Sequence, residues 1–229
     1  ATTQQGIQDG KGWSYSGYAQ DEFRYSDRLT LNIGLRYELA MPFVEKENRI
    51  VVINPDKKST VQPLAPKGLL YPGDEGIPDG GYKTDKNNLA PRVAFAWDPT
   101  GKGKTSVRGA WGIFYDSLAG QGDLFQAGAL APPFTPLVEL NATAANPFLT
   151  LANPLGTGSQ TPNLFPANLT IIGWGPEFTT PSVMHYNLTV QQQLGDNLGL
   201  EVGYVGSKGK NLPMFMEINP LINGVRKYP

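Results

Sequence analysis

The stretch LTLNIGLRYELA, residues 29–40, alternates between apolar and polar positions over its whole length. Its odd positions are all apolar: Leu29, Leu31, Ile33, Leu35, Tyr37 and Leu39. Its even positions are mostly polar or small: Thr30, Asn32, Gly34, Arg36, Glu38 and Ala40. Successive side chains of a β-strand point to opposite faces, so this period of two predicts a strand with one apolar and one polar face.

The residues before this strand follow the same plan. Residues 13–23, WSYSGYAQDEF, place aromatic and small residues on one side and mostly polar residues on the other, although Asp21 interrupts the apolar side. The link RYSDR, residues 24–28, is short and turn-like. Residues 13–40 are therefore predicted to form an antiparallel hairpin.

Two further hairpins are predicted, at residues 88–116 and 183–206. In the first, LAPRVAFAW and VRGAWGIFY both alternate and flank a short polar link. In the second, MHYNLTVQQQL and LGLEVGYVG are separated only by Gly195, Asp196 and Asn197, a tight link of the kind that joins antiparallel strands.

The link DPTGKGKTS, residues 98–106, deserves comparison with a phosphate-binding loop. That motif requires a glycine five positions before its Gly-Lys-Ser/Thr end, and here Asp98 stands in that position. The motif must also begin a helix, whereas residues 106–115 alternate as a strand. The link is predicted to be a hairpin turn.

Long segments, residues 41–87 and 117–181, separate the hairpins and are rich in Pro, Gly and Asn. Short and long connections in strict alternation are typical of outer-membrane β-barrels, whose periplasmic turns are short and whose extracellular loops are long. Aromatic residues are expected at both interfaces of such a barrel. At the long-loop ends we expect Trp13, Tyr15, Tyr37, Tyr115, Tyr186 and Tyr204 to take this role. At the short-turn ends we expect Phe23 and Trp97.

Composition excludes several classes of function. The 229 residues carry 19 Lys and Arg against 20 Asp and Glu, which argues against a nucleic-acid partner. There is no cysteine and a single histidine, His185, so no clustered thiolate or imidazole ligands are available for a metal. No Gly-x-Ser-x-Gly elbow or other catalytic constellation is found, and Asp74 and Glu75 lack calcium-loop spacing. We expect neither enzymatic activity nor a cofactor.

The three hairpins also resemble a known family. The segments YAQDEFRYSDRLTLNIGLRYE, NLAPRVAFAWDPTGKGKTSVRGAWGIFYD and YNLTVQQQLGDNLGLEVGYVGSKGKNL are similar to consecutive hairpins of TonB-dependent outer-membrane receptors, in particular the Oar-like group. The resemblance covers the six strands and not the long loops. It implies a 22-stranded barrel with a plug domain inside, located in the bacterial outer membrane and driven by the TonB complex.

The same resemblance sets what we expect of this chain. It has no recognisable plug domain or TonB-contacting segment, so we expect an internal fragment of the barrel, all-β, with up-and-down antiparallel strands. Its expected partners are outer-membrane lipid, the remaining strands, the plug domain, the TonB complex and an imported solute. The strands would be alike for iron chelates, saccharides and peptides, so the solute stays open.

Charged residues of the polar faces are the candidate lumen-lining positions: Glu22, Arg36, Glu38, Arg92, Arg108 and Glu201. The alternative reading is a ladder of cross-strand ion pairs along the barrel wall. His185 is predicted to be an ordinary polar wall residue. Pro91 cannot donate to a central ladder and is expected near the long-loop end, where pairing stops.

Solute uptake by a receptor barrel is the function these observations favour. The alternative from another class is a soluble, secreted all-β binding module, such as a β-sandwich with large loops. A jelly-roll hydrolase is the third possibility, because dispersed carboxylates alone do not exclude it.

Overall fold

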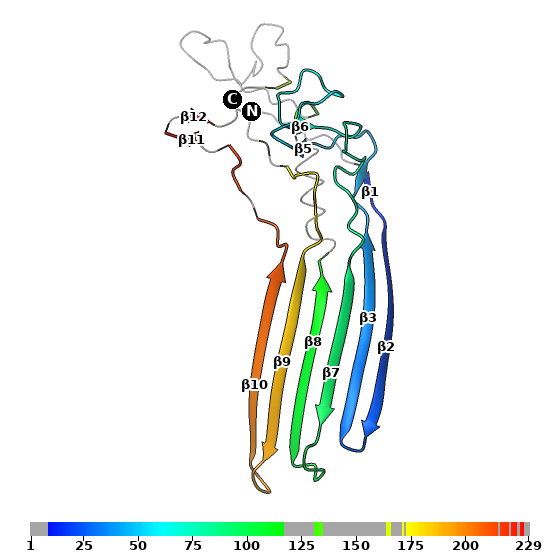
Figure 1. The fold of residues 1–229 in the computed structure, drawn as a ribbon, viewed down its shortest axis with the longest axis vertical. Helices are drawn as coiled ribbons and strands as arrows, with labels where there is room; N and C mark the ends of the chain where they lie inside the picture. Colours follow the sequence, from blue (N-terminus) through cyan, green and yellow to red (C-terminus); the bar gives the residue numbers. More distant parts are fainter. Residues whose placement is uncertain are drawn as a thin grey trace, which may run out of the picture. The chain divides into compact units, whose positions relative to one another are not determined.

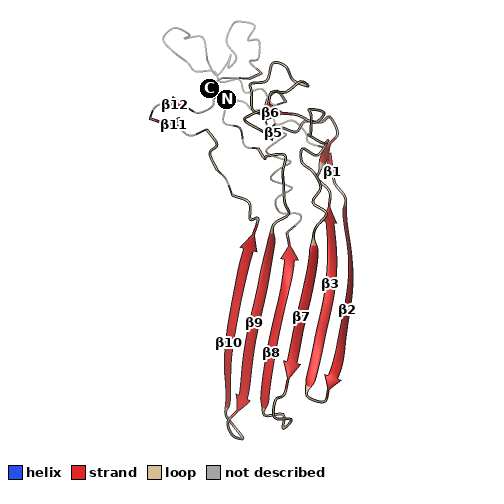
Figure 2. Ribbon diagram, viewed as in Figure 1, coloured by secondary structure: helices blue, strands red, loops and turns tan. Residues whose placement is uncertain are grey.

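The computed structural model describes residues 9–116, 131–134, 164–165, 171, 173–214, 216–219, 221–223 and 225–226. These residues form strands, turns and irregular segments (Figure 2). Within these ranges there is no helix with the length and apolarity needed to cross a membrane. The chain divides into two compact units. The sheet unit comprises Trp13–Met41, Thr84–Gln121 and Phe178–Pro229, and the loop unit comprises Ala1–Gly12, Pro42–Lys83 and Gly122–Glu177.

Six long strands make up one antiparallel sheet in the sheet unit (Figure 1). They are β2 (Ser14–Ser26), β3 (Leu29–Ala40), β7 (Leu89–Trp97), β8 (Thr105–Tyr115), β9 (Ser182–Gln193) and β10 (Gly199–Lys210). Their order is β10-β9-β8-β7-β3-β2, so neighbours in the sequence are neighbours in the sheet. The prediction of an all-β, up-and-down antiparallel architecture is confirmed.

Among the described residues, the six-stranded sheet has two unpaired edges. The edge strands β2 and β10 do not pair with each other. Bacterial single-chain barrels have at least about eight strands, and six long ones are described here. The six described strands therefore do not close into a barrel by themselves.

The register keeps the two predicted faces separate. Ile33 of β3 pairs with Val93 of β7, and the neighbouring Asn32 pairs with Ala94. Directly paired residues of antiparallel strands point to the same face, and a slip by one residue would exchange the faces. We call the face of Ile33 the apolar face and the face of Asn32 the polar face.

The last hairpin is longer than the sequence pattern predicts. β10 continues to Lys210, because Ser207–Lys210 stay paired with Ser182–His185 of β9. The expectation that Tyr204 lies at the long-loop end is therefore wrong, since Tyr204 lies near the middle of β10. The extension also adds Lys208 and Lys210 to the strand.

Pro91 lies where the prediction puts it. It pairs with Leu35 of β3, while the pairing of β7 with β8 begins only at the next residue, Arg92. The missing N–H of Pro91 therefore costs no hydrogen bond to β8.

The carboxylate of Asp98 organises the turn between β7 and β8. It accepts hydrogen bonds from the backbone N–H of Thr100 (3.1 Å), Gly101 (2.9 Å) and Gly103 (2.8 Å). Gly101 and Gly103 have φ near +70°, which glycine tolerates best. The hydrogen bond from the Gly103 N–H, with the others, lowers the pKa of Asp98. The backbone N–H groups that a bound phosphate would need are donated to the Asp98 side chain instead. A strand, β8, follows the link and not a helix, so the prediction of a hairpin turn is confirmed.

The loop unit has its own short strands and core, which the sequence pattern did not predict. β1 (Gly10–Lys11) pairs with β4 (Val44–Glu45), and β5 (Val52–Ile53) pairs with β6 (Leu69–Leu70). Buried Tyr71 of the first long segment packs with Ala131 of the second and donates a hydrogen bond to the carbonyl of Pro132 (3.0 Å). The two long connections thus share one core. The remaining strands, β11 (Leu221–Ile222) and β12 (Val225–Arg226), pair with each other in the sheet unit.

Candidate functional site: the polar face of the sheet

The structure places all six candidate residues on the polar face, which follows from their register with Asn32 and its neighbours. They are distributed over five strands: Glu22 on β2, Arg36 and Glu38 on β3, Arg92 on β7, Arg108 on β8 and Glu201 on β10. They form a charged surface along the sheet and not a compact cluster.

Three of these six charges have neutral hydrogen-bond partners. Glu22 accepts a hydrogen bond from the Asn32 amide (3.3 Å), Glu201 accepts one from the Gln191 amide, and Arg108 donates to the Ser106 hydroxyl (3.2 Å). Arg36 and Glu38 form an ion pair, but both belong to β3. No ion pair joins two of the described long strands at these positions, and the choice between lumen-lining residues and wall residues stays a prediction.

This arrangement has a consequence for solvation. Four of the six candidates, Glu22, Arg92, Arg108 and Glu201, keep a formal charge that no opposite charge of the described strands balances. Burying such charges in an apolar medium would cost several kcal/mol each. The polar face is thus built to face water or a polar partner.

Arg92 belongs to a cluster with Phe114 and His185 that strand periodicity does not predict. Its guanidinium carbon lies 4.4 Å from the centroid of the Phe114 ring, and the ring of His185 meets Phe114 edge-on at 5.5 Å. Gly112 lies between Arg92 and His185 in the same row, and a Cβ there would be 3.2 Å from the Arg92 stem. The signal was available: Phe114 is an aromatic residue in the polar phase of residues 107–115. As predicted, His185 lies on the polar face.

The opposite face is apolar and exposed across the sheet. The exposed fractions of Ile33, Val93 and Val202 are 46%, 43% and 63%. The apolar face also includes Leu31, Leu35, Phe95, Trp111, Leu188, Val190 and Leu200. A contiguous apolar surface of this extent is rarely found on a soluble monomer and indicates contact with lipid or protein.

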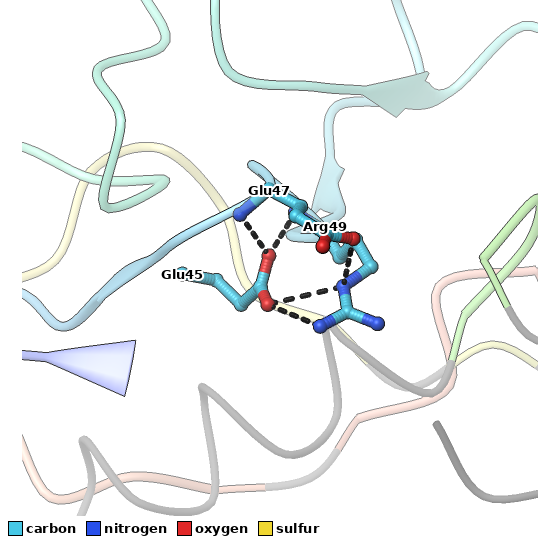
Figure 3. Close-up of polar contacts among 3 residues, drawn as sticks. All are labelled: Glu45, Glu47 and Arg49. Atoms are coloured by element: carbon cyan, nitrogen blue, oxygen red, sulfur yellow. Dashed lines mark hydrogen bonds and ion pairs between the residues drawn. The ribbon is translucent and has the colours of Figure 1, made fainter. Parts of the chain in front are cut away.

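Two carboxylates are buried in the loop unit, and both have their oxygens occupied. Glu45 accepts hydrogen bonds from the N–H groups of Glu47 (2.8 Å) and Arg49 (2.9 Å), and its other oxygen accepts from the Arg49 guanidinium at 2.6 and 3.0 Å (Figure 3). Burial alone would raise the pKa of Glu45, but these hydrogen bonds outweigh it and lower the pKa to about 2. The group anchors the turn after β4.

Asp74 plays a similar role for residues 59–61. Its carboxylate accepts hydrogen bonds from the Ser59 hydroxyl, from the N–H and hydroxyl of Thr60, and from the N–H groups of Val61 and Tyr71. Burial would raise its pKa, yet the hydrogen bonds lower it to about 2. The neighbouring Glu75 is exposed and pairs with Lys57 instead. Asp74 and Glu75 thus do not form a joint cation site, and no group of three or more potential metal ligands occurs in the described part of the chain.

Comparison with known proteins agrees with this geometry. The sequence matches the family model for an outer membrane beta barrel domain over residues 1–228. No curated protein and no solved structure gives a significant match. The family match favours a membrane barrel over the soluble β-sandwich, and it locates the protein in the bacterial outer membrane. The chain belongs to the outer membrane beta barrel domain family.

Proposed function

We propose that this chain forms part of the wall of an outer-membrane receptor that captures a solute and imports it with energy from the TonB complex. The observation that carries the proposal is the set of uncompensated charges on the polar face: Glu22, Arg92, Arg108 and Glu201. In a closed barrel whose apolar face meets lipid, the polar face lines the interior. Fixed charges in a hydrated lumen suit a path for a polar solute or the surface that holds a plug.

The loop unit supports a capturing role. The connection from β3 to β7 and the connection from β8 to β9 leave the same end of the sheet, because β3 and β8 run in the same direction. Their residues share the core around Tyr71 and Ala131. Loops positioned by a rigid scaffold are common binding elements, and an ordered core limits the entropy lost when a ligand binds.

Coupling to the TonB complex rests on the resemblance of the three hairpins to that receptor group. This coupling distinguishes the proposed receptor from a passive diffusion channel, whose barrel wall would also have an apolar and a polar face. The two mechanisms differ in their energy requirement, and this difference gives the test.

The test measures uptake by cells that produce the protein carrying this chain and by cells that lack it. Iron chelates, oligosaccharides and peptides would be offered at nanomolar concentration, with and without an uncoupler of the proton gradient. We expect one class to accumulate only in producing, energised cells with an intact TonB complex. Uptake that persists without the TonB complex would indicate a passive channel, and uptake equal in the two strains would refute transport.

A pair of variants connects the result to the polar face. Arg92→Gln together with Arg108→Gln removes two polar-face charges, whereas Lys102→Gln together with Lys104→Gln removes two charges of the turn between β7 and β8. We expect the first pair to change the rate or apparent affinity of uptake and the second to leave both unchanged. An equal effect of the two pairs would contradict a role for the polar face.

A further inference from the structure

We propose that Lys208 and Lys210 bind the phosphate groups of an outer-leaflet glycolipid. The extension of β10 places both residues on the apolar face, where they follow Leu200, Val202, Tyr204 and Gly206 at every second position of the strand. Apart from Asp21 of β2, these two lysines are the only charged residues on the apolar face of the six described strands. The proposal is independent of whether the barrel transports a solute.

The height of the lysines along the strand matches the level of lipid headgroups. Eight residues separate Leu200 from Lys208, which is about 26 Å along a strand and about 20 Å across the membrane at a tilt of about 40°. The lipid-facing apolar band of such barrels is about 25 Å tall. If Leu200 lies at the lower boundary, Lys210 lies at the upper one, and the long stem of Lys208 extends its ammonium group to the same level.

The end of the strand fixes the leaflet. The lysines are at the end of the sheet from which the long connections leave, and long connections are extracellular in outer-membrane barrels. The outer leaflet is therefore the one they reach. Neither lysine has a carboxylate partner among the described residues, so both ammonium groups are free for a ligand of opposite charge.

The surface below the lysines is shaped to hold the ligand's apolar part. The rings of Tyr186 and Tyr204 lie 6.1 Å apart, and the Tyr186 ring covers Gly206, where an added Cβ would lie 2.4 Å from the ring. An aromatic pair directly below two cations fits a molecule with acyl chains beneath and phosphate above. This chemistry is that of a phosphorylated glycolipid, and a free phosphate ion would use only the lysines.

The experiment measures binding of diphosphorylated lipid A to the protein carrying this chain, assembled with its full set of strands in phosphatidylcholine nanodiscs. Replacing both lysines, in the variant K208Q/K210Q, should weaken binding on the order of 25-fold, about fivefold for each lysine near an anionic lipid surface. The matched control K102Q/K104Q removes two lysines from the turn between β7 and β8 and should bind like the wild type. The variant K208R/K210R, which keeps both charges, should also retain binding.

Several outcomes would overturn the proposal. Equal affinity of K208Q/K210Q and the wild type would show that the lysines do not contact the lipid. Equal affinity for lipid A and its dephosphorylated form would exclude phosphate recognition. Displacement of lipid A by inorganic phosphate at similar concentration would identify a soluble anion as the ligand. Thermal unfolding in the nanodisc checks that each variant is folded before its binding is compared.

Discussion

Replacing Val93 by arginine tests whether the apolar face meets lipid. Val93 is the central residue of β7, four residues from each end, or about 10 Å from either end along the membrane normal for a strand tilted by about 40°. It pairs with Ile33 on one side and Trp111 on the other, so no acidic partner is directly opposite. An arginine near the bilayer midplane of a barrel costs about 2 to 4 kcal/mol.

The neighbouring residue supplies the control. Ala94 points to the polar face and pairs with Asn32 and Ala110, so Ala94→Arg introduces the same side chain one residue away on the other face. We expect it to change the free energy of unfolding by less than about 1 kcal/mol. Ile33→Arg is a weaker probe than Val93→Arg, because Asp21 is the cross-strand partner of Ile33 and would pair with the new charge.

The assay is reversible urea unfolding of the assembled barrel in lipid vesicles, monitored by tryptophan fluorescence. A loss of stability for Val93→Arg that exceeds the loss for Ala94→Arg by about 2 kcal/mol or more would agree with the assignment. Equal losses would refute it, since a face that meets water accepts arginine at either position. A larger loss for Ala94→Arg would mean that the two faces are exchanged.

Three further predictions concern the loops and turns. Asp74→Asn should speed hydrogen exchange of the three amides that donate to Asp74 on the order of 30-fold, because about 2 kcal/mol of hydrogen bonding is lost, whereas exposed Asp79→Asn should not. In the wild type, the same amides should lose their protection from hydrogen exchange as pH falls from about 4 to about 2. The pKa of Asp74 is about 2 in the folded state against 3.8 in the unfolded state, so its ionised form contributes about 2 kcal/mol of stability above the unfolded pKa, and this contribution disappears when the carboxylate is protonated. Protection that is constant over this pH range, after correction for intrinsic exchange rates, would contradict this prediction. Trypsin added to intact cells should cleave at exposed Lys58 or Lys67 and spare Lys102 and Lys104 until the outer membrane is opened. The reverse pattern would show that the short turns are extracellular and the long connections periplasmic.

The sequence by itself determined the strands and their faces. Alternation such as that of residues 29–40 is a local property, because each backbone step turns the side chain to the other side whatever the strand pairs with. The same logic located the hairpin turn at Asp98 and put Glu22, Arg36, Glu38, Arg92, Arg108 and Glu201 on one face. These features required no knowledge of the rest of the fold.

Only the tertiary structure decided which groups meet. The partners of Glu22 and Glu201 are amides of adjacent strands, and the contact of Arg92 with Phe114 joins β7 to β8, so each depends on a register that no single strand encodes. The length of β10 follows from pairing with β9 as far as Lys210, although periodicity weakens there. The shared core of Tyr71 and Ala131 joins residues 60 positions apart in Pro- and Gly-rich segments without periodicity. Periodicity reports the geometry of one strand, whereas partners, strand ends and loop cores result from contacts distant in the sequence.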